Sequence, residues 1–408
     1  MTSYKNKNEK KISLQSMFIG LIMIYCIIFP ADKINIKEIL LGITLIVCFP
    51  QIQEYVKKRG NKLFFWAILY PFITTIVSLT IGDSTLSGAL SYGYVWIYLL
   101  LIPPIVLLNI DIKKTFIIAT TAVAIIVDFI YVADMIGFIS IYSNPLISFF
   151  SSMHEIQWGK GVLATFGYSI FYKSSPLIIF TYGYMLYRKK YIWASILFLS
   201  FIASGTRANF LIATIVLVLI PLFCSNEKPT TKMIITVLII GVAIYTSPYI
   251  IERFTELNEL KYDRSEEVKI KAVYSIFDHM NAAPYRYVFG SGVGSFFYSS
   301  GRNAYVDVVE VSFFDYFRQV GSICFLLFLG FLVSPMKWLF KNQRWMLICF
   351  LGYLAIAFTN PLLVTSTSFM AYVLIMSNGM GDRRFSLLDN TISENKDLLA
   401  NNNYKENT

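Results

Sequence analysis

Runs of apolar residues long enough to cross a lipid bilayer recur along almost the whole chain, and they limit its fold more than any other feature. A helix that spans a bilayer needs about 20 mostly apolar residues. Twelve segments approach this requirement, although several of them are short. The predicted spans lie near residues 13–30, 35–51, 63–81, 92–110, 115–139, 174–188, 190–204, 207–224, 232–251, 313–335, 344–360 and 361–379.

The composition agrees with a membrane protein. The 408 residues are 56% hydrophobic and 15% charged, and the mean hydropathy is +0.59. A soluble globular protein carries about 25% charged residues. We therefore predict an all-α polytopic membrane protein with about twelve transmembrane helices, forming a single domain over residues 1–384. The polar, Asn-rich residues 385–408 are predicted to be a disordered tail.

The distribution of basic residues favours an orientation with both termini in the cytoplasm. With a cytoplasmic N-terminus, the segments on the inner side hold 22 of the 35 Lys and Arg residues, as the positive-inside rule requires. The net charge of +10 is spread over the ends of apolar segments, so we expect no nucleic-acid partner. The five cysteines form no CxxC pair and there are two histidines, so we predict neither a disulfide framework nor a metal site.

Two long segments are predicted on the outer side. The first, residues 140–174, is rich in aromatic residues and is expected to lie in the membrane interface. The second is a large loop over residues 252–312, between the ninth and tenth spans. Within it, residues 264–280 carry apolar side chains at every fourth position, from Val268 to Met280, which predicts an amphipathic helix.

Arg207 is the first candidate site residue, in a tight Ser-Gly-Thr-Arg turn that faces outward in this orientation. An outer-face arginine departs from the positive-inside trend. Its guanidinium could bind a phosphate group through its planar fork of donors. The alternative is an interfacial arginine whose charged head reaches toward water.

The large outer loop contributes further candidates. Gly290, Gly292 and Gly294 alternate with other residues, as in loops that bind phosphate, but the run is equally typical of a turn with positive φ angles. Glu310 stands where the loop re-enters the membrane, and could act as a general base for a sugar hydroxyl. Alternatively, Glu310 is an exposed carboxylate or an ion-pair partner of Arg318.

Two aspartates inside the fifth predicted span point to another class of function. Asp128 lies deep in the span and Asp134 near its outer end, on different helix faces. Ionisable residues at membrane depth are costly and commonly serve ion or substrate pathways. Either aspartate would suit a proton-coupled transporter. His154 in the first outer segment is interpreted as an ordinary interfacial histidine.

The order of these features resembles the O-antigen polymerase and ligase superfamily of bacterial surface-polysaccharide assembly. The resemblance covers about residues 192–330: the Arg207 turn, the amphipathic helix beginning at Arg264, the run Phe289-Gly290-Ser291-Gly292-Val293-Gly294, and Glu310. Ligases of this superfamily carry a histidine at the position that matches Glu310, whereas polymerases often carry glutamate. The resemblance therefore implies a polymerase.

By this resemblance, Arg207, Arg264 and Glu310 are the expected catalytic residues, and Arg286 and Arg318 are expected to help bind the lipid diphosphate. The implied reaction joins oligosaccharide repeat units carried on undecaprenyl diphosphate, without a metal or cofactor. The expected location is the bacterial cytoplasmic membrane, with membrane lipid and a chain-length regulator protein as further candidate partners. The alternatives are an O-antigen ligase and a flippase for lipid-linked oligosaccharides.

Overall fold

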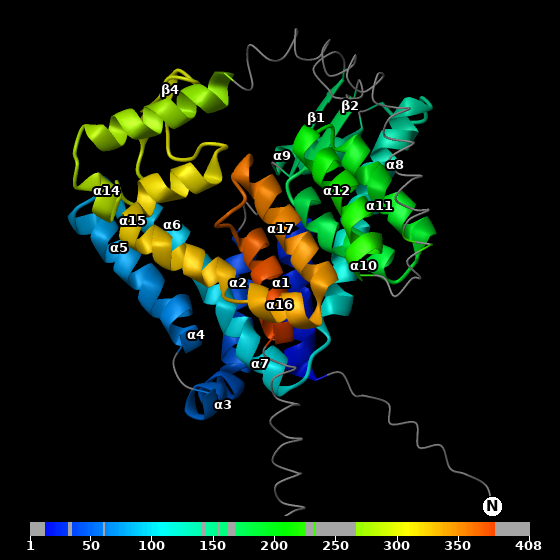
Figure 1. Ribbon diagram of the computed structural model, residues 1–408, viewed down its shortest axis with the longest axis horizontal. Helices are drawn as coiled ribbons and strands as arrows, with labels where there is room; N and C mark the ends of the chain where they lie inside the picture. Colours follow the sequence, from blue (N-terminus) through cyan, green and yellow to red (C-terminus); the bar gives the residue numbers. More distant parts are fainter. Residues whose placement is uncertain are drawn as a thin grey trace, which may run out of the picture.

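The computed structural model describes residues 13–31, 35–59, 62–140, 144–153, 155–160, 168–224, 230, 232 and 267–379. It shows a helical bundle with two small hairpins at one end (Figure 1). The α-helices are α1 (Leu14–Ile28), α2 (Ile36–Val47), α3 (Phe49–Arg59), α4 (Lys62–Phe64), α5 (Tyr70–Thr80), α6 (Leu86–Gly93), α7 (Ile102–Leu107), α8 (Ile112–Met135), α9 (Pro145–Ser152), α10 (Ile178–Tyr187), α11 (Tyr191–Ala203), α12 (Arg207–Cys224), α14 (Arg286–Phe289), α15 (Ser312–Val333), α16 (Met336–Asn342) and α17 (Arg344–Phe358). Residues 267–281 and 366–379 are also helical. The remaining elements are a π-helix, η1 (Phe65–Leu69), two 3-10 helices, η2 (Tyr94–Leu101) and η3 (Ser175–Leu177), and the strands β1 (Ile156–Lys160), β2 (Tyr168–Tyr172), β3 (Phe297–Ser299) and β4 (Ala304–Val306).

Among the described residues, five helices are long and apolar enough to cross a membrane. They are Lys62–Thr80, Leu86–Leu107, Ile112–Met135, Arg207–Cys224 and Ser312–Asn342. The pair formed by α2 and α3 is bent by 62° and adds a sixth span if it is counted as one. The chain is thus mostly helical and has the character of a membrane-embedded protein, but the prediction of twelve spans is not confirmed.

The difference in the number of spans comes from helix length. The apolar helices α1, α11 and α17 contain 15, 13 and 15 residues. At about 1.5 Å per residue each is shorter than the hydrocarbon core of a bilayer, which is about 30 Å thick. Hydropathy located these helices, but it does not distinguish a short helix from a complete span. Apart from Lys232, the predicted span at 232–251 lies outside the described residues.

A cluster of aromatic rings joins the middle of the bundle. Trp96 contacts Trp66 on one side and Phe369 on the other, with ring centroids 6.2 and 5.0 Å apart. Phe328 and Phe331 of α15 also pack on Trp96. These contacts fasten α15 against η1, η2 and the helical residues 366–379. Residues of α15 and η2, together with Ser366, line the candidate site described below.

Residues 267–309, which we call the cap, form the unit that precedes α15 at one end of the bundle (Figure 1). The amphipathic helix predicted at 264–280 is confirmed over its described part, residues 267–281. Its apolar face, Ala272, Ile276 and Met280, is buried against Phe297 and Val309 in a core separate from that of the bundle. The cap therefore has its own small hydrophobic core.

The first predicted outer segment contains α9 and an antiparallel hairpin in which Ile156 pairs with Tyr172, and its location in the membrane interface stays a prediction. The all-α prediction missed this hairpin and the second one, β3–β4. Next to the hairpin, the buried Glu155 carboxylate accepts the Ala31 N–H at 2.9 and 3.0 Å, and the Tyr172 hydroxyl donates to the carbonyl of Ile28. These contacts fix the end of α1 beneath the hairpin.

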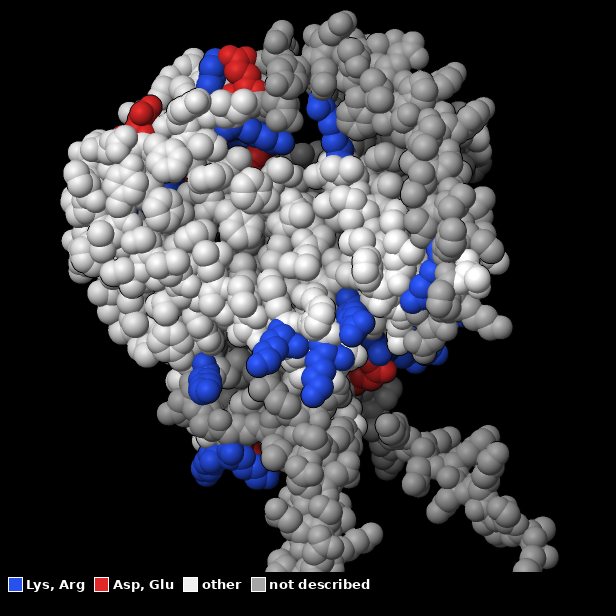
Figure 2. Space-filling view, in the orientation of Figure 1, with Lys and Arg blue, Asp and Glu red and all other residues white. Residues whose placement is uncertain are grey.

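The two ends of the molecule differ in their basic side chains. Lys and Arg gather in the lower part of the space-filling view, over α3, α4 and α16, whereas the cap and the β1–β2 hairpin lie at the opposite end (Figures 1 and 2). The lower group includes Lys57, Lys58, Lys62, Lys337 and Lys341. The positive-inside rule would place this end in the cytoplasm.

This separation predicts opposite accessibility for single cysteines introduced at the two ends. Lys271→Cys in the cap should react with a membrane-impermeant thiol reagent added to intact cells, and Lys341→Cys in α16 should react only after the membrane is opened. The wild-type chain, with its own cysteines, measures the background. Labelling of Lys341→Cys but not Lys271→Cys in intact cells would reverse the orientation.

Candidate functional site

A break in α15 is the starting point of the site. Gly321 has φ 71° and ψ 176° inside this helix, so the carbonyls of Arg318 and Gln319 lose their usual partners one turn further on. The glycine loop, residues 290–295, supplies the missing donors. The N–H groups of Ser291 and Gly292 bond to the Arg318 and Gln319 carbonyls at 2.7 and 2.9 Å.

The glycines of this loop are required by close packing. Gly290, Gly292 and Gly294 all have positive φ angles. A Cβ on Gly290 would lie 2.3 Å from the Gln319 carbonyl oxygen, and one on Gly294 would lie 2.8 Å from the backbone of Gly88. These features support the interpretation of the run as a turn.

The loop's amide groups are largely turned toward the protein. Besides those of Ser291 and Gly292, the Val293 N–H donates to Ser78 Oγ at 2.9 Å, and the Gly290 N–H to the Arg286 carbonyl at 2.7 Å. A phosphate-binding loop needs amides directed at the ligand. Nothing in this geometry supports phosphate binding by the glycine loop, so that role stays a prediction.

Arg318 joins the cap to the broken helix. Its side chain is 0% exposed. Nε bonds to Asp315 Oδ1 at 2.9 Å, and Nη1 bonds to the hydroxyls of Ser291 and Ser295 at 3.1 and 2.9 Å. Nη2 donates to the carbonyl of Asp307 at 2.9 Å.

The guanidinium of Arg318 also lies over the Phe297 ring, 4.3 Å from its centroid. All three nitrogen atoms are therefore engaged inside the protein, as a structural cation requires. The predicted contact of Arg318 with a lipid diphosphate has no support from this arrangement.

Glu310 is at the edge of the cap and its side chain is 41% exposed. Its carboxylate lies 3.8 Å from Lys269 Nζ and 3.6 Å from the guanidinium of Arg302. The interpretation of Glu310 as an ion-pair partner of Arg318 is corrected, because Asp315 holds that position at 2.9 Å. Glu310 is therefore accessible, and both of its ion pairs are longer than a direct hydrogen bond.

Arg286 is largely buried at the start of α14. It bonds to Asp83 at 2.6 Å and to the His279 carbonyl at 2.7 Å. Burial and the guanidinium groups of Arg286 and Arg318 lower the pKa of His279 to about 4 from its ordinary value of 6.5. His279 is therefore neutral at physiological pH. The Arg286–Asp83 pair ties the cap to the turn between α5 and α6.

Arg207 and Asp128 belong to other helices of the bundle. Arg207 is the first residue of α12 and is half-buried. Arg264 lies outside the described residues. Asp128 is buried in α8, and neither carboxylate oxygen has a hydrogen-bond partner among the described residues.

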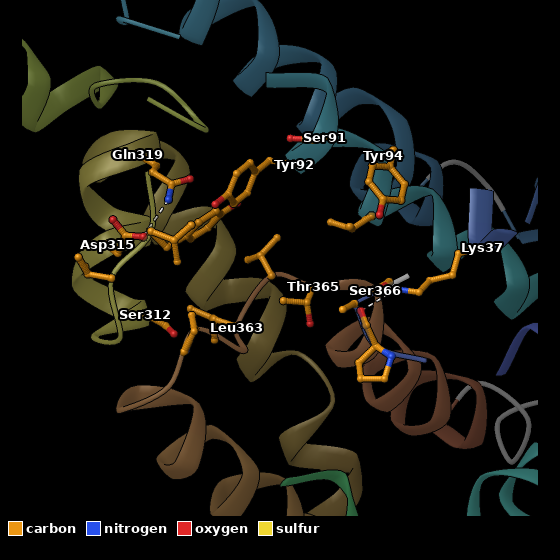
Figure 3. Close-up of a pocket in the computed structure, with 18 residues that line it drawn as sticks. Lys37, Ser91, Tyr92, Tyr94, Ser312, Asp315, Gln319, Leu363, Thr365 and Ser366 are labelled. Atoms are coloured by element: carbon orange, nitrogen blue, oxygen red, sulfur yellow. Dashed lines mark hydrogen bonds between the residues drawn. The ribbon is translucent and has the colours of Figure 1, made fainter. Parts of the chain in front are cut away.

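A polar cavity of about 260 Å³ lies where the cap meets the bundle (Figure 3). One wall comes from the N-terminal part of α15, with Asp315 and Gln319. The opposite wall carries Lys37 of α2 and Ser366. The other lining residues are Pro30, Ala31, Ser91, Tyr92, Tyr94, Val95, Val308, Val309, Ser312, Tyr316, Pro361, Leu363, Val364 and Thr365.

Sequence reasoning missed the residues of this cavity. The signal for Lys37 was its place at the outer end of a predicted span, against the positive-inside trend. The signal for Asp315 was its spacing of three from Arg318, which places both on one helix face. None of Arg207, Arg286, Glu310 and Arg318 lines the cavity, although Arg318 positions Asp315, which does.

Comparisons add no family to this description, because neither a scan against protein-family models nor a search of curated proteins finds a match. In the part of the chain that the structure describes, no group of three or more His, Cys, Asp or Glu residues could hold a metal ion.

Gly290→Ala should lower the free energy of unfolding by about 3 kcal/mol, because it places a Cβ against the Gln319 carbonyl in a backbone conformation that suits glycine alone. Gly330→Ala is the matched control on α15, where a Cβ would meet nothing within 4 Å. Thermal unfolding in detergent measures both. Equal stability of the two variants would contradict the packing described for the glycine loop.

Arg318→Lys should destabilise the protein by about 3 kcal/mol or more, because a single ammonium cannot replace a fork that bonds to three segments. The control is Arg302→Lys, whose side chain is 41% exposed and whose loss should cost less than about 1 kcal/mol. The same unfolding assay compares them. A tolerated Arg318→Lys would show that the network contributes little to stability.

Proposed function

We propose that this protein is a membrane glycosyltransferase that polymerises oligosaccharide repeat units carried on undecaprenyl diphosphate, at the outer face of the bacterial cytoplasmic membrane. The observation that carries the proposal is the polar cavity, which has a buried lysine on one wall and a buried carboxylate on the opposite wall, among apolar helices. Burying such groups is costly, and their presence at membrane depth favours a function for them.

The arrangement around the cavity supports a lipid-linked substrate. A lipid carrier would stay in the bilayer while its sugar and phosphate enter a polar space beneath the cap. Figure 2 shows a hollow beside the cap with Lys and Arg side chains at its edge, which suits a substrate bearing negative charge.

In the proposed reaction, the protein orients the two substrates, stabilises the charge of the leaving group and accepts one proton. A hydroxyl of the acceptor sugar attacks the anomeric carbon of the donor glycan, the glycosidic bond forms, and the lipid diphosphate leaves with the electrons of the broken C–O bond. Arg207 and Arg264 are the proposed stabilisers of the leaving group. Glu310 is the proposed acceptor of the hydroxyl proton.

Deletion of the gene, followed by sizing of the surface glycan, tests this function. We expect product with a single repeat unit in the deletion strain and restored length with the wild-type gene. Glu310→Gln should leave mostly single-repeat product at normal protein level, because general-base assistance contributes about 10²–10⁴-fold in rate. Arg302→Gln is the control, since it removes a partner of Glu310 and keeps the carboxylate.

Other outcomes identify other functions. Missing surface glycan with normal lipid-linked polymer would indicate a ligase, and intermediates trapped on the inner side would indicate a flippase. Polymer of full length from a normally expressed Glu310→Gln would remove Glu310 from the mechanism.

A second candidate function is a proton-coupled transporter for lipid-linked oligosaccharides. Asp128 favours it, because this carboxylate is buried in a membrane helix without a hydrogen-bond partner among the described residues. The cap, with its own core and its attachment to α15, is an addition that a transporter does not require.

A further inference from the structure

The polar cavity has two chemically different ends. Lys37 carries a positive charge on one wall and Asp315 a negative charge on the other (Figure 3). Gln319 stands beside Asp315 and donates through Nε2 to Asp315 Oδ2 at 3.0 Å. A ligand that fits this space should therefore be anionic at one end and rich in hydroxyl groups at the other.

The cation is part of a built site. Lys37 is 3% exposed, and its Nζ donates to the Pro30 carbonyl at 2.6 Å and to Ser366 Oγ at 3.2 Å. The adjacent Ala31 N–H is held by the carboxylate of Glu155. The wall of the cavity around the lysine is thus fixed from two directions, by Ser366 and by the segment that leads into β1.

At the end of the cavity opposite Lys37, the side-chain oxygen of Gln319 is an acceptor without a donor from the described residues. Gln319 is 2% exposed, and its Oε1 has no hydrogen-bond partner among the described residues. Leaving a buried amide oxygen without a donor is unfavourable, because the group has lost its hydrogen bonds to water. A hydroxyl group of a ligand in the cavity would supply the missing donor, and the Tyr92 ring points toward this end (Figure 3).

From these observations we propose that the cavity binds the sugar and phosphate groups of one lipid-linked substrate, with a phosphate facing Lys37 and the first sugar ring facing Asp315 and Gln319. This inference rests on the proposed function and adds which end of the substrate lies where. About 260 Å³ lies below the usual range of about 300–1,000 Å³ for pockets that hold drug-sized ligands, which suits one sugar ring with its phosphate. The lysine acts as a point charge toward phosphate oxygens.

Occupancy of the cavity can be tested with a cysteine placed in its wall, so that lipid bound elsewhere on the protein does not contribute to the signal. Ser91 lines the cavity from α6 and is exposed, so Ser91→Cys should react with a small water-soluble thiol reagent in nanodiscs. A polyprenyl diphosphate that carries one hexose should protect this cysteine. Reaction of the chain without the added cysteine sets the background.

Replacing the polar side chain at each end of the cavity should change the protection of Ser91→Cys in a different way. Adding Lys37→Met should raise the probe concentration needed for protection at least about tenfold, whether or not the probe carries its hexose. Adding Gln319→Leu should weaken protection by the hexose-bearing probe alone. Lys62→Met and Gln343→Leu, at the opposite end of the molecule, should change neither.

Three results would overturn the proposal. They are no protection of Ser91→Cys by the polyprenyl diphosphate with or without its hexose, unchanged protection when Lys37→Met is added, and an equal loss of protection when Lys62→Met is added. Protection by inorganic diphosphate at the same concentration as the lipid would assign the site to a free anion instead. Protection of Ser91→Cys together with normal glycan length in the deletion strain would reject the polymerase and keep the site.

Discussion

The buried guanidinium of Arg318 is the interaction on which the rest of the site depends. A buried charge is tolerated only when hydrogen bonds and an opposite charge compensate its loss of water. Here the compensation comes from three separate places: Asp315 on the same helix, the serines of the glycine loop, and the Asp307 carbonyl beyond β4. Separation of the cap from α15 would therefore remove hydrogen bonds that compensate this buried charge. These bonds make the cap and the first part of α15 a single mechanical unit.

The break at Gly321 and the glycine loop also complete each other. An interrupted helix leaves carbonyls without donors, and a loop of alternating glycines offers amides without a regular partner. In this fold, the amides of the glycine loop donate to the carbonyls that the broken helix leaves without partners. The close approach needs glycine on both sides, because a Cβ on Gly321 would lie 2.3 Å from the Val288 carbonyl oxygen. The interruption also ends the regular helix just after Gln319, which places that side chain and Asp315 at the wall of the cavity.

Sequence reasoning reached the parts of this structure that depend on local pattern. Hydropathy located the apolar helices, and the spacing from Val268 to Met280 predicted the cap helix. It could not reach contacts that join distant segments, such as Glu155 with Ala31 or Arg286 with Asp83, because no local pattern encodes them. The alternative that paired Arg318 with Glu310 was wrong, because Asp315, three residues before Arg318 on the same helix, holds that position. Lys37 was not among the predicted site residues, because the contacts of its Nζ with Pro30 and Ser366 join segments that are distant in the sequence or lie outside any local pattern.

The two carboxylates at the start of α15 differ in what their surroundings allow. Asp315 is buried and holds short hydrogen bonds from Arg318 and Gln319, so a proton on it would disrupt the network that attaches the cap. Glu310 is 41% exposed, and its two cationic neighbours lie at 3.6 and 3.8 Å, longer than a direct hydrogen bond. Paired acidic groups with contrasting environments commonly divide the work of a site between them. In the proposed reaction, Glu310 is the proton acceptor proposed outside the cavity lining, and Asp315, held by Arg318 and Gln319, is the carboxylate proposed to face the sugar.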